Sequence, residues 1–270
     1  MRSFIVLFSH LFFLSCWVFP QSLTHKRVIS LLPSYTEIIF ELGGGNNLVG
    51  VTNFCNYPPQ AQMITKVGDY LNPDKEMIYR LKPDIIFMGD WKNDVIKKLA
   101  LKRNIKIVVI PQEKKLEDIY ITIETIARYI NKNDRALEII NTMKKKLKDG
   151  LKPKSFKKVY VDLDYDFWTC GSESFISDVI LKAGGVNIFN DVKLGYFKTN
   201  WEEIVRRNPD VILIVSSRNP DEFKSLISWQ KVSAIKNSKV YKFSEYEREI
   251  ISRPTPRIVG IVQNLRKIFQ

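Results

Sequence analysis

Glu76-Met77-Ile78-Tyr79-Arg80-Leu81-Lys82-Pro83-Asp84-Ile85-Ile86 decides the fold, because its pattern returns 126 positions later as Glu202-Glu203-Ile204-Val205-Arg206-Arg207-Asn208-Pro209-Asp210-Val211-Ile212. In each copy a glutamate opens a short amphipathic helix and suits the positive end of the helix dipole. The residue before the proline disfavours the α conformation, so the helix ends there and a buried β-branched strand begins. Two matching halves of the molecule are therefore predicted.

A small-residue turn precedes each copy: Gly43-Gly44-Gly45-Asn46 in the first half and Gly184-Gly185-Val186-Asn187 in the second. The alternative interpretation is that Pro-Asp before an apolar run is ordinary punctuation between a helix and a strand in any α/β protein. Because turn, helix and strand recur in the same order, we favour a duplicated architecture.

Strands and helices alternate along much of the chain. Alternation with short connections is typical of parallel sheets flanked by helices. The expected strands are 28–31, 48–51, 85–88, 105–110, 159–163, 211–215 and 240–243, and the expected helices are 36–42, 77–81, 95–101 and 257–269.

The middle of the chain breaks this rhythm, because residues 116–151 carry apolar side chains at helical spacing without a clear strand. We predict one long linking helix there. The predicted fold class is α/β, with two lobes of parallel sheet joined by a long backbone helix that limits bending between them. The predicted parts are a signal segment and tail at 1–25, an N-terminal lobe at 26–114, the linking helix at 115–152 and a C-terminal lobe at 153–270.

The N-terminus carries a targeting segment. An almost unbroken apolar stretch from Phe4 to Phe19 follows Arg2 and is shorter than a membrane-spanning helix, so we interpret it as a secretory signal. A small residue precedes Cys16, as in a lipoprotein signal, although Phe13 stands where Leu is usual. The alternative is that Cys16 is discarded with the signal. The predicted location is periplasmic or extracytoplasmic, with a lipid anchor if Cys16 becomes the mature N-terminus.

Residues suited to catalysis are scarce. Both histidines, His10 and His25, precede the first expected strand, which excludes a Ser/His/Asp triad, a Cys/His pair and an imidazole-rich zinc site from the folded body. Cys55 and Cys170, one in each half, are too few for a disulfide scaffold, and whether they pair stays open. We therefore expect neither enzymatic activity nor a resident cofactor or metal.

The net charge of +13 comes from Lys-rich segments such as 144–148, without aromatic interleaving or a Gly-rich RNA-binding signature. Solvated faces are the first interpretation of this charge. Attraction to an anionic ligand or a membrane surface is the second, and nucleic acid is the third.

Aromatic residues stand in several predicted loops. Loops at the carboxyl ends of parallel strands converge on the ligand crevice of α/β folds, and Phe54 and Trp91 follow strands in that sense. Aromatic walls would suit a large, flat, partly apolar ligand, whereas the alternative for each single ring is lobe packing or surface exposure. The loop aromatics are Phe54, Tyr57, Tyr70, Trp91, Tyr196 and Tyr246.

Six motifs mark residues 26–270. They are Arg27-Val28-Ile29-Ser30-Leu31-x-Pro33-Ser34-x-Thr36-Glu37, Asn56-Tyr57-Pro58-Pro59-Gln60-Ala61, Leu81-Lys82-Pro83-Asp84, Gly171-x-Glu173-Ser174, Gly184-Gly185-x-Asn187-Ile188-Phe189 and Ser252-Arg253-Pro254-x-Pro256-Arg257-Ile258. Together they resemble the substrate-binding proteins of vitamin B12 and siderophore ABC importers, most closely the cobalamin-binding members. The resemblance implies two Rossmann-like lobes, a rigid linking helix and a ligand that is held between the lobes and not chemically changed.

The resemblance also implies which residues meet the ligand. The aromatic positions that hold the corrin in the cobalamin-binding members fall on Phe54, Tyr70 and Tyr196. A family tryptophan falls on Gly89, and Trp91, two positions later, is the alternative to it.

Two further implications concern the end of the chain and the partner. The family's last ligand-facing loop falls around residues 244–253, which include Tyr246. Glutamates at the positions of Glu76 and Glu202 meet arginines on the transmembrane subunits in this family; the alternative is that both acids serve only the helix dipole. We expect a monomer with ABC permease subunits and a small molecule as partners, and no nucleic acid.

The predicted function is that of the extracytoplasmic substrate-binding component of an ABC importer, with cobalamin or a related corrinoid as ligand. An iron-siderophore or heme is the alternative ligand, because the basic protein suits an anion and a tyrosine phenolate can bind heme iron where histidine is lacking. An enzyme such as a chelatase would need metal-binding or acid/base residues that converge in the cleft, and the lack of histidine in the folded body and of clustered cysteines argues against it. A structural surface lipoprotein would leave the repeated glutamates and the loop aromatics unexplained.

Overall fold

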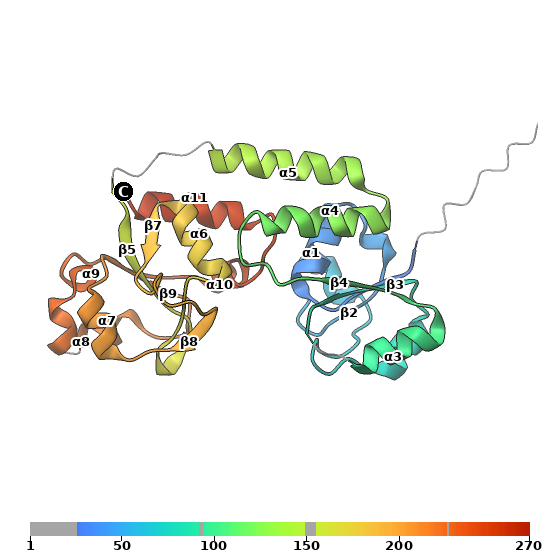
Figure 1. The fold of residues 1–270 in the computed structure, drawn as a ribbon, viewed down its shortest axis with the longest axis horizontal. Coiled ribbons are helices and arrows are strands. Elements are labelled where there is room, and N and C mark those ends of the chain that lie inside the picture. The colour runs from blue at the N-terminus through green and yellow to red at the C-terminus, as the bar shows by residue number, and fades with distance from the viewer. Residues whose placement is uncertain (1–25, 92–93, 149–154, 226) are drawn as a thin grey trace, which may run out of the picture.

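Parallel β-sheet forms the centre of each of two lobes (Figure 1). The computed structural model describes residues 26–91, 94–148, 155–225 and 227–270. The first sheet contains β1 (Val28–Ser30), β2 (Leu48–Val51), β3 (Ile85–Gly89) and β4 (Lys106–Ile110), in the order β2-β1-β3-β4. The second contains β5 (Lys157–Asp162), β7 (Gly185–Asn187), β9 (Val211–Ile214) and β10 (Val240–Lys242), in the order β10-β9-β5-β7. All pairs within these sheets are parallel, which confirms the predicted fold class.

Helices cover the sheets, as buried parallel strands require. The α-helices are α1 (Pro33–Glu41), α2 (Lys75–Leu81), α3 (Asp94–Arg103), α4 (Asp118–Ile130), α5 (Asn133–Lys148), α6 (Phe175–Ala183), α7 (Trp201–Arg207), α8 (Pro220–Ser225), α9 (Ser233–Lys236), α10 (Glu245–Ile251) and α11 (Ile258–Ile268). Short 3-10 turns are η1 (Gly45–Asn47), η2 (Pro59–Met63), η3 (Tyr165–Phe167) and η4 (Ile227–Lys231).

The two sheets share one topology. β1, β2, β3 and β4 correspond to β5, β7, β9 and β10, so each sheet is ordered second-first-third-fourth. The repeated pattern forms α2 before β3 and α7 before β9. Asp74 and Asn200 cap the starts of these helices with their side chains, and Lys82 and Asn208 end them in the left-handed conformation. The prediction of two matching halves is confirmed.

The aspartate after each proline ties the helix-to-strand turn to the neighbouring strand. Asp84 accepts a hydrogen bond from the backbone nitrogen of Arg27 at 2.7 Å, and Asp210 accepts one from that of Lys158 at 2.9 Å. Each aspartate also donates its backbone N–H to the carbonyl of the same partner at 2.8 Å. Pro-Asp therefore does more here than separate a helix from a strand, because its aspartate fixes the position of β3 beside β1 and of β9 beside β5.

The linking segment is a pair of helices, and the prediction of one long helix is wrong. α4 ends at Ile130. The left-handed backbone of the next residue, Asn131 (φ 57°), lets the chain turn, and α5 runs back along α4 (Figure 1). The apolar spacing did not reveal this break, because both helices bury a stripe in one core, with Ile126 on α4 and Ile140 on α5. α5 reaches α11 and so joins the lobes (Figure 1).

One apolar cluster runs through both lobes. It includes Val28 in β1, Met143 on α5, and Val161 and Val259 in the C-terminal lobe. A shared core of this kind resists separation of the lobes, because opening it would expose apolar surface to water.

Some features lay beyond the sequence prediction. A small antiparallel pair, β6 (Trp168–Cys170) with β8 (Tyr196–Lys198), stands beside the second sheet. Cys55 and Cys170 are both buried and free, one in each lobe.

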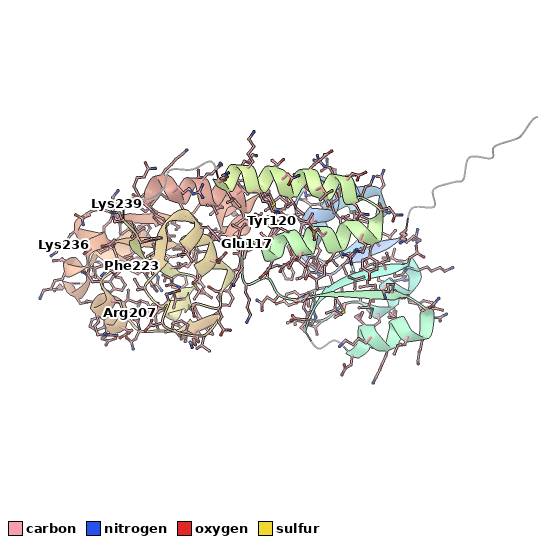
Figure 2. All side chains as sticks on the ribbon, turned by 45° about the horizontal axis from the view of Figure 1, so that its top comes forward. Glu117, Tyr120, Arg207, Phe223, Lys236 and Lys239 are labelled. Carbon is pink, nitrogen blue, oxygen red and sulfur yellow. The ribbon has the colours of Figure 1, made fainter. Side chains whose placement is uncertain are left out.

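The basic side chains include residues far from the junction of the lobes. Lys236 and Lys239 lie at the outer end of the C-terminal lobe, whereas Glu117 and Tyr120 lie near the middle of the molecule (Figure 2).

Across the described ranges, no helix is both long and apolar enough to span a membrane. The predicted signal segment and Cys16 lie outside the described residues.

Candidate functional site

The strand order locates the ligand-facing end of each lobe. In open α/β sheets, ligands bind beyond the carboxyl ends of the strands at the point where the strand order reverses. That point lies between β1 and β3 in the first sheet and between β5 and β9 in the second. β3 ends at Gly89 and is followed by Asp90 and Trp91, and residues 215–218 follow β9.

Three of the predicted ligand residues meet at the N-terminal switch point. The ring centroids of Tyr70 and Trp91 lie 5.5 Å apart, with their planes at 77°. A Cβ atom on Gly89 would overlap the Trp91 ring, so this ring occupies the space beside the bare backbone. Gly89 and Trp91 therefore act together: the first provides room and the second provides the aromatic face.

The other predicted aromatics are exposed in separate places. Phe54 lies in the loop after β2, and its side chain is 56% exposed. Tyr196 begins β8 in the C-terminal lobe, and in the described part of the chain its ring does not contact Tyr70 or Trp91. Tyr196 is 45% exposed as a whole, but its phenol oxygen is buried, which raises the pKa of this group to about 12.

Tyr246 lies in the first turn of α10 and takes part in a contact between the lobes. The Arg257 guanidinium lies 5.6 Å from the centre of its ring and 3.7 Å from that of Tyr57 in the N-terminal lobe. A cation next to an aromatic face is attracted by the ring quadrupole. Arg257 therefore lies close to one aromatic ring of each lobe.

Sequence reasoning missed a basic and aromatic corner in the C-terminal lobe. Arg218, just after β9, lies 4.9 Å from the ring centre of Tyr165 and 5.2 Å from that of Phe167. Its Nε donates to the buried Asp162 at the end of β5 at 3.3 Å, and Ser216 Oγ donates to the same carboxylate. Burial raises the pKa of Asp162, although these donors oppose the effect. The sequence places Asp162 in one expected strand and Arg218 after another, but the strand order that brings them together is visible only in the folded sheet.

The two predicted docking glutamates occupy equivalent exposed positions. Glu76 lies in the first turn of α2 and Glu202 in the first turn of α7. Glu203 is held by Arg206 and Arg207, which leaves Glu202 as the exposed acid at that helix start. A shallow hollow of about 450 Å³ lies beside Glu76 and is also lined by Tyr79 and Leu99.

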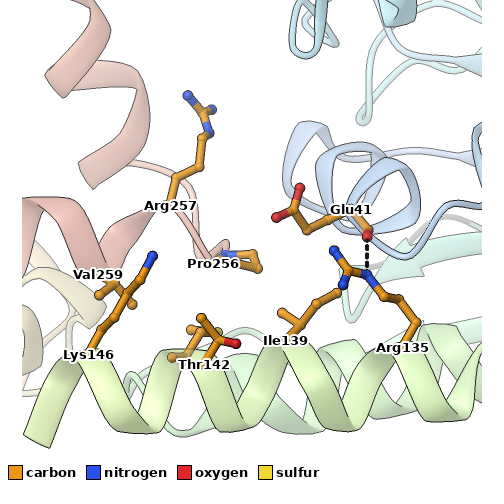
Figure 3. A pocket seen from close by; sticks show the side chains of 9 residues that line it. Glu41, Arg135, Ile139, Thr142, Lys146, Pro256, Arg257 and Val259 are labelled. Atoms are coloured by element: carbon orange, nitrogen blue, oxygen red, sulfur yellow. Dashed lines mark hydrogen bonds between the residues drawn. The ribbon is translucent and has the colours of Figure 1, made fainter.

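A separate hollow of about 260 Å³ lies among α5, the end of α1 and the start of α11. Figure 3 shows Arg135 on α5, whose Nε donates to the carbonyl of Glu41 at 3.3 Å, opposite Pro256 and Val259. The predicted aromatic residues do not line this hollow. Among the described residues, no group of three or more His, Cys, Asp or Glu side chains could hold a metal ion.

Comparison with known proteins identifies the family to which this two-lobed fold belongs. The family described as "Periplasmic binding protein" matches residues 28–246. The chain belongs to this family. Periplasmic binding proteins are substrate-binding transport proteins of the ABC importer class, not an enzyme family.

Relatives extend the likeness over most of the chain. An uncharacterized ABC transporter substrate-binding lipoprotein, YvrC of Bacillus subtilis, is 27% identical, over 89% of this chain and 78% of its own length. A vitamin B12-binding protein of Vibrio cholerae is 28% identical, over 89% of this chain and 87% of its own length. The structure of the periplasmic heme-binding protein HutB of Vibrio cholerae superposes with a TM-score of 0.79, over 90% and 98% of the two chains. At 17% identity, that likeness shows the fold alone.

Proposed function

We propose that this protein binds cobalamin or a related corrinoid between its two lobes and delivers it to the transmembrane subunits of an ABC importer. The aromatic wall of the N-terminal lobe carries the proposal: Tyr70 and Trp91 stand edge to face, with Trp91 beside the bare backbone of Gly89. Rings at a switch point offer a flat ligand apolar area that leaves water on binding. The relative named vitamin B12-binding protein supports this ligand.

Heme or an iron-siderophore is the second candidate. The likeness in fold to a heme-binding protein supports it, as does the net charge of +13, which suits an anionic ligand. Guanidinium groups attract carboxylates such as heme propionates. Tyr196 is poorly suited to bind iron as a phenolate, because burial of its phenol oxygen raises its pKa.

An absorption spectrum distinguishes these ligands. Corrinoid, heme and ferric siderophore have different visible bands, so the protein purified from its native host should show the corrinoid spectrum. Calorimetric titration with cyanocobalamin, hemin and a ferric siderophore then ranks their affinities. Binding of hemin or the siderophore without binding of cyanocobalamin would replace the first candidate by the second.

Glu76 and Glu202 are proposed to dock the two lobes onto the permease. They head equivalent helices in lobes of one topology, so a pair of basic sites on a two-subunit permease can meet one carboxylate from each lobe. The exposed starts of α2 and α7 and the hollow beside Glu76 support this role.

Cys16 is proposed to be the lipidated N-terminus of an extracytoplasmic protein. The lipoprotein named among the relatives supports this anchor. A lipid on Cys16 would keep the substrate-binding lobes near the membrane that holds the permease.

A further inference from the structure

Three motifs that lie far apart in the sequence meet where the lobes touch. Glu37 lies in α1 and Asn56 follows β2, whereas Glu249 lies in α10 and Arg253 and Arg257 lie between α10 and α11. We call these five residues the interlobe cluster. The N-terminal lobe supplies the first two of them, and the C-terminal lobe supplies the other three.

Glu37 is the centre of the interlobe cluster. Its side chain is only 3% exposed. Arg257 donates to it from Nε at 2.9 Å and from Nη2 to both carboxylate oxygens at 2.7 Å, and Arg253 Nη1 donates at 2.8 Å. Charge-assisted contacts of a guanidinium to both oxygens fix orientation as well as distance. Two cations of one lobe thus converge on one buried anion of the other.

Asn56 connects the interlobe cluster to the loop that carries Phe54. Its Oδ1 accepts from Arg253 Nη1 at 2.8 Å, and its Nδ2 donates to Glu249 Oε1 at 2.6 Å. Arg253 Nη2 also donates to the carbonyl oxygen of Phe54 at 3.5 Å. A loop of the N-terminal lobe is therefore held by side chains of the C-terminal lobe.

The segment between the two arginines is stiff. Pro254 and Pro256 each fix the backbone φ angle, and Thr255 between them is fully buried. Because the prolines already restrict this backbone, the segment loses little conformational entropy when Arg253 and Arg257 both bind the Glu37 carboxylate.

Other polar contacts between the halves are of a different kind. Across the described ranges, these other contacts join the C-terminal lobe to residues 114–117, just before α4, or to α5. The pair Lys114–Glu173 is typical, with side chains 58% and 48% exposed, whereas Arg253 is 14% exposed. Exposed pairs contribute little, but removing one partner of a buried pair leaves an uncompensated charge away from water.

We propose that the interlobe cluster is a pin that sets the angle between the lobes and positions the Phe54 loop for the ligand. Glu37 is the positioning residue, and Arg253 transmits its effect to the loop. The lobe-angle role stands on the contacts alone, and its consequence for the ligand rests on the proposed function.

The lobe angle can be measured without any ligand. Spin labels at Leu101→Cys in α3 and Ile227→Cys in η4 report the distance between the lobes, because these side chains are 85% and 83% exposed. Cys16→Ser removes the one cysteine outside the described residues, and Cys55 and Cys170 are buried. Double electron–electron resonance should give a narrow distribution for the parent and a broader, shifted one for Glu37→Gln.

Matched variants separate the pin from general damage. Glu173→Gln breaks the exposed Lys114 pair and should leave the distribution unchanged. Arg253→Lys keeps the charge but loses the fork geometry, so it should broaden the distribution even if Glu37→Gln fails to fold. A parent-like distribution in the folded Glu37→Gln and Arg253→Lys variants would overturn the pin.

Titration with cyanocobalamin and hemin tests the consequence for the ligand. If the binding-competent arrangement falls to a tenth of the population, the apparent Kd rises about tenfold. Binding of neither probe by the parent would count against the proposed function and leave the distance result standing. A broadened distribution with unchanged Kd for the probe that binds would reject the positioning role of Glu37.

Discussion

The ring of Tyr70 stands edge-on to the ring of Trp91, 5.5 Å from centroid to centroid. Tyr70 comes from the loop before α2 and Trp91 from the turn after β3, so two segments build one aromatic wall at the N-terminal switch point. Tyr196 belongs to the other lobe and is the predicted opposite wall. Contacts to both walls should dominate the affinity for a flat ligand, because aromatic faces bury large apolar areas.

Replacing Tyr70 and Tyr196 by Ala should weaken cyanocobalamin binding by several-fold to about a hundredfold, at about 25 cal/mol per Å² of lost apolar burial. Tyr70 is 37% and Tyr196 45% exposed, so thermal stability near neutral pH should change little. Calorimetric titration measures the loss. Tyr79→Ala, which removes an exposed ring on α2, is the control and should bind normally; unchanged affinity in the double variant would remove both residues from the site.

Gly89→Ala should push the Trp91 ring out of place and destabilise the protein by about 1–3 kcal/mol, since the new Cβ overlaps that ring. Ligand affinity should fall with it. Tryptophan fluorescence and denaturant unfolding measure the two effects. Gly260→Ala is the matched control: it meets no atom within 4 Å and should stabilise α11 by about 0.5–1 kcal/mol.

The pKa of Tyr196 sets a dependence of stability on high pH. Burial raises this pKa from 10.0 to about 12, so the unfolded chain releases its proton first as the pH rises. The free energy of unfolding should therefore fall between pH 10 and pH 12, and this group has no such effect below that window. Urea unfolding at pH 9 and pH 11 gives the free energy of unfolding of the parent and of Tyr196→Phe. This free energy should fall less between the two pH values in Tyr196→Phe than in the parent, and an equal fall would contradict the assignment.

Local patterns predicted the repeated elements because helix acids, the residue before proline and β-branched runs act within a few positions. Asp84 and Asp210 show the limit of that reasoning: their position was plain in the sequence, but their bonds to Arg27 and Lys158 need the neighbouring strand. The turn at Asn131 was missed because a left-handed residue leaves no gap in the apolar spacing of the two helices.

Tertiary contacts decided what the sequence left without a role. Glu37 and Arg257 both stood in quoted motifs, but they are 220 positions apart and nothing local indicates that they bind each other. Arg218 was overlooked because its value as a site residue depends on the order of β5 and β9, which only the folded sheet shows. Trp91 stays a predicted ligand residue, and the structure shows that Gly89 leaves room for its ring.

Cys16→Ala should release the protein from membranes or stop its processing, since a lipid on Cys16 would be its anchor. Detergent phase separation of cells that make the parent and the variant measures this. Cys55→Ala and Cys170→Ala, which alter buried cysteines, should leave partition into the detergent phase unchanged. An aqueous-phase parent would instead indicate cleavage to a free protein.

Charge reversal at the two docking positions is the sharpest test of the duplicated pattern. Glu76→Lys with Glu202→Lys places like charges against the basic sites proposed on the permease, so docking and uptake should be abolished while ligand binding stays normal. If the acids serve only the helix dipole, the double variant loses about 0.3–1 kcal/mol per helix and transports normally.

The matched control for this reversal is Glu124→Lys with Asp134→Lys. Both residues are exposed, one on α4 and one on α5. These linking helices lie away from α7 and from α3, which contacts α2 (Figure 1). The change in net charge is the same in both double variants. Transport into reconstituted vesicles and ligand titration of all three proteins measure the outcome. Because the control carries an equal charge change, loss of uptake in both double variants would indicate a general electrostatic effect. Loss in Glu76→Lys with Glu202→Lys alone assigns docking to the two helix starts, and uptake by that variant at the parent's rate would reject it.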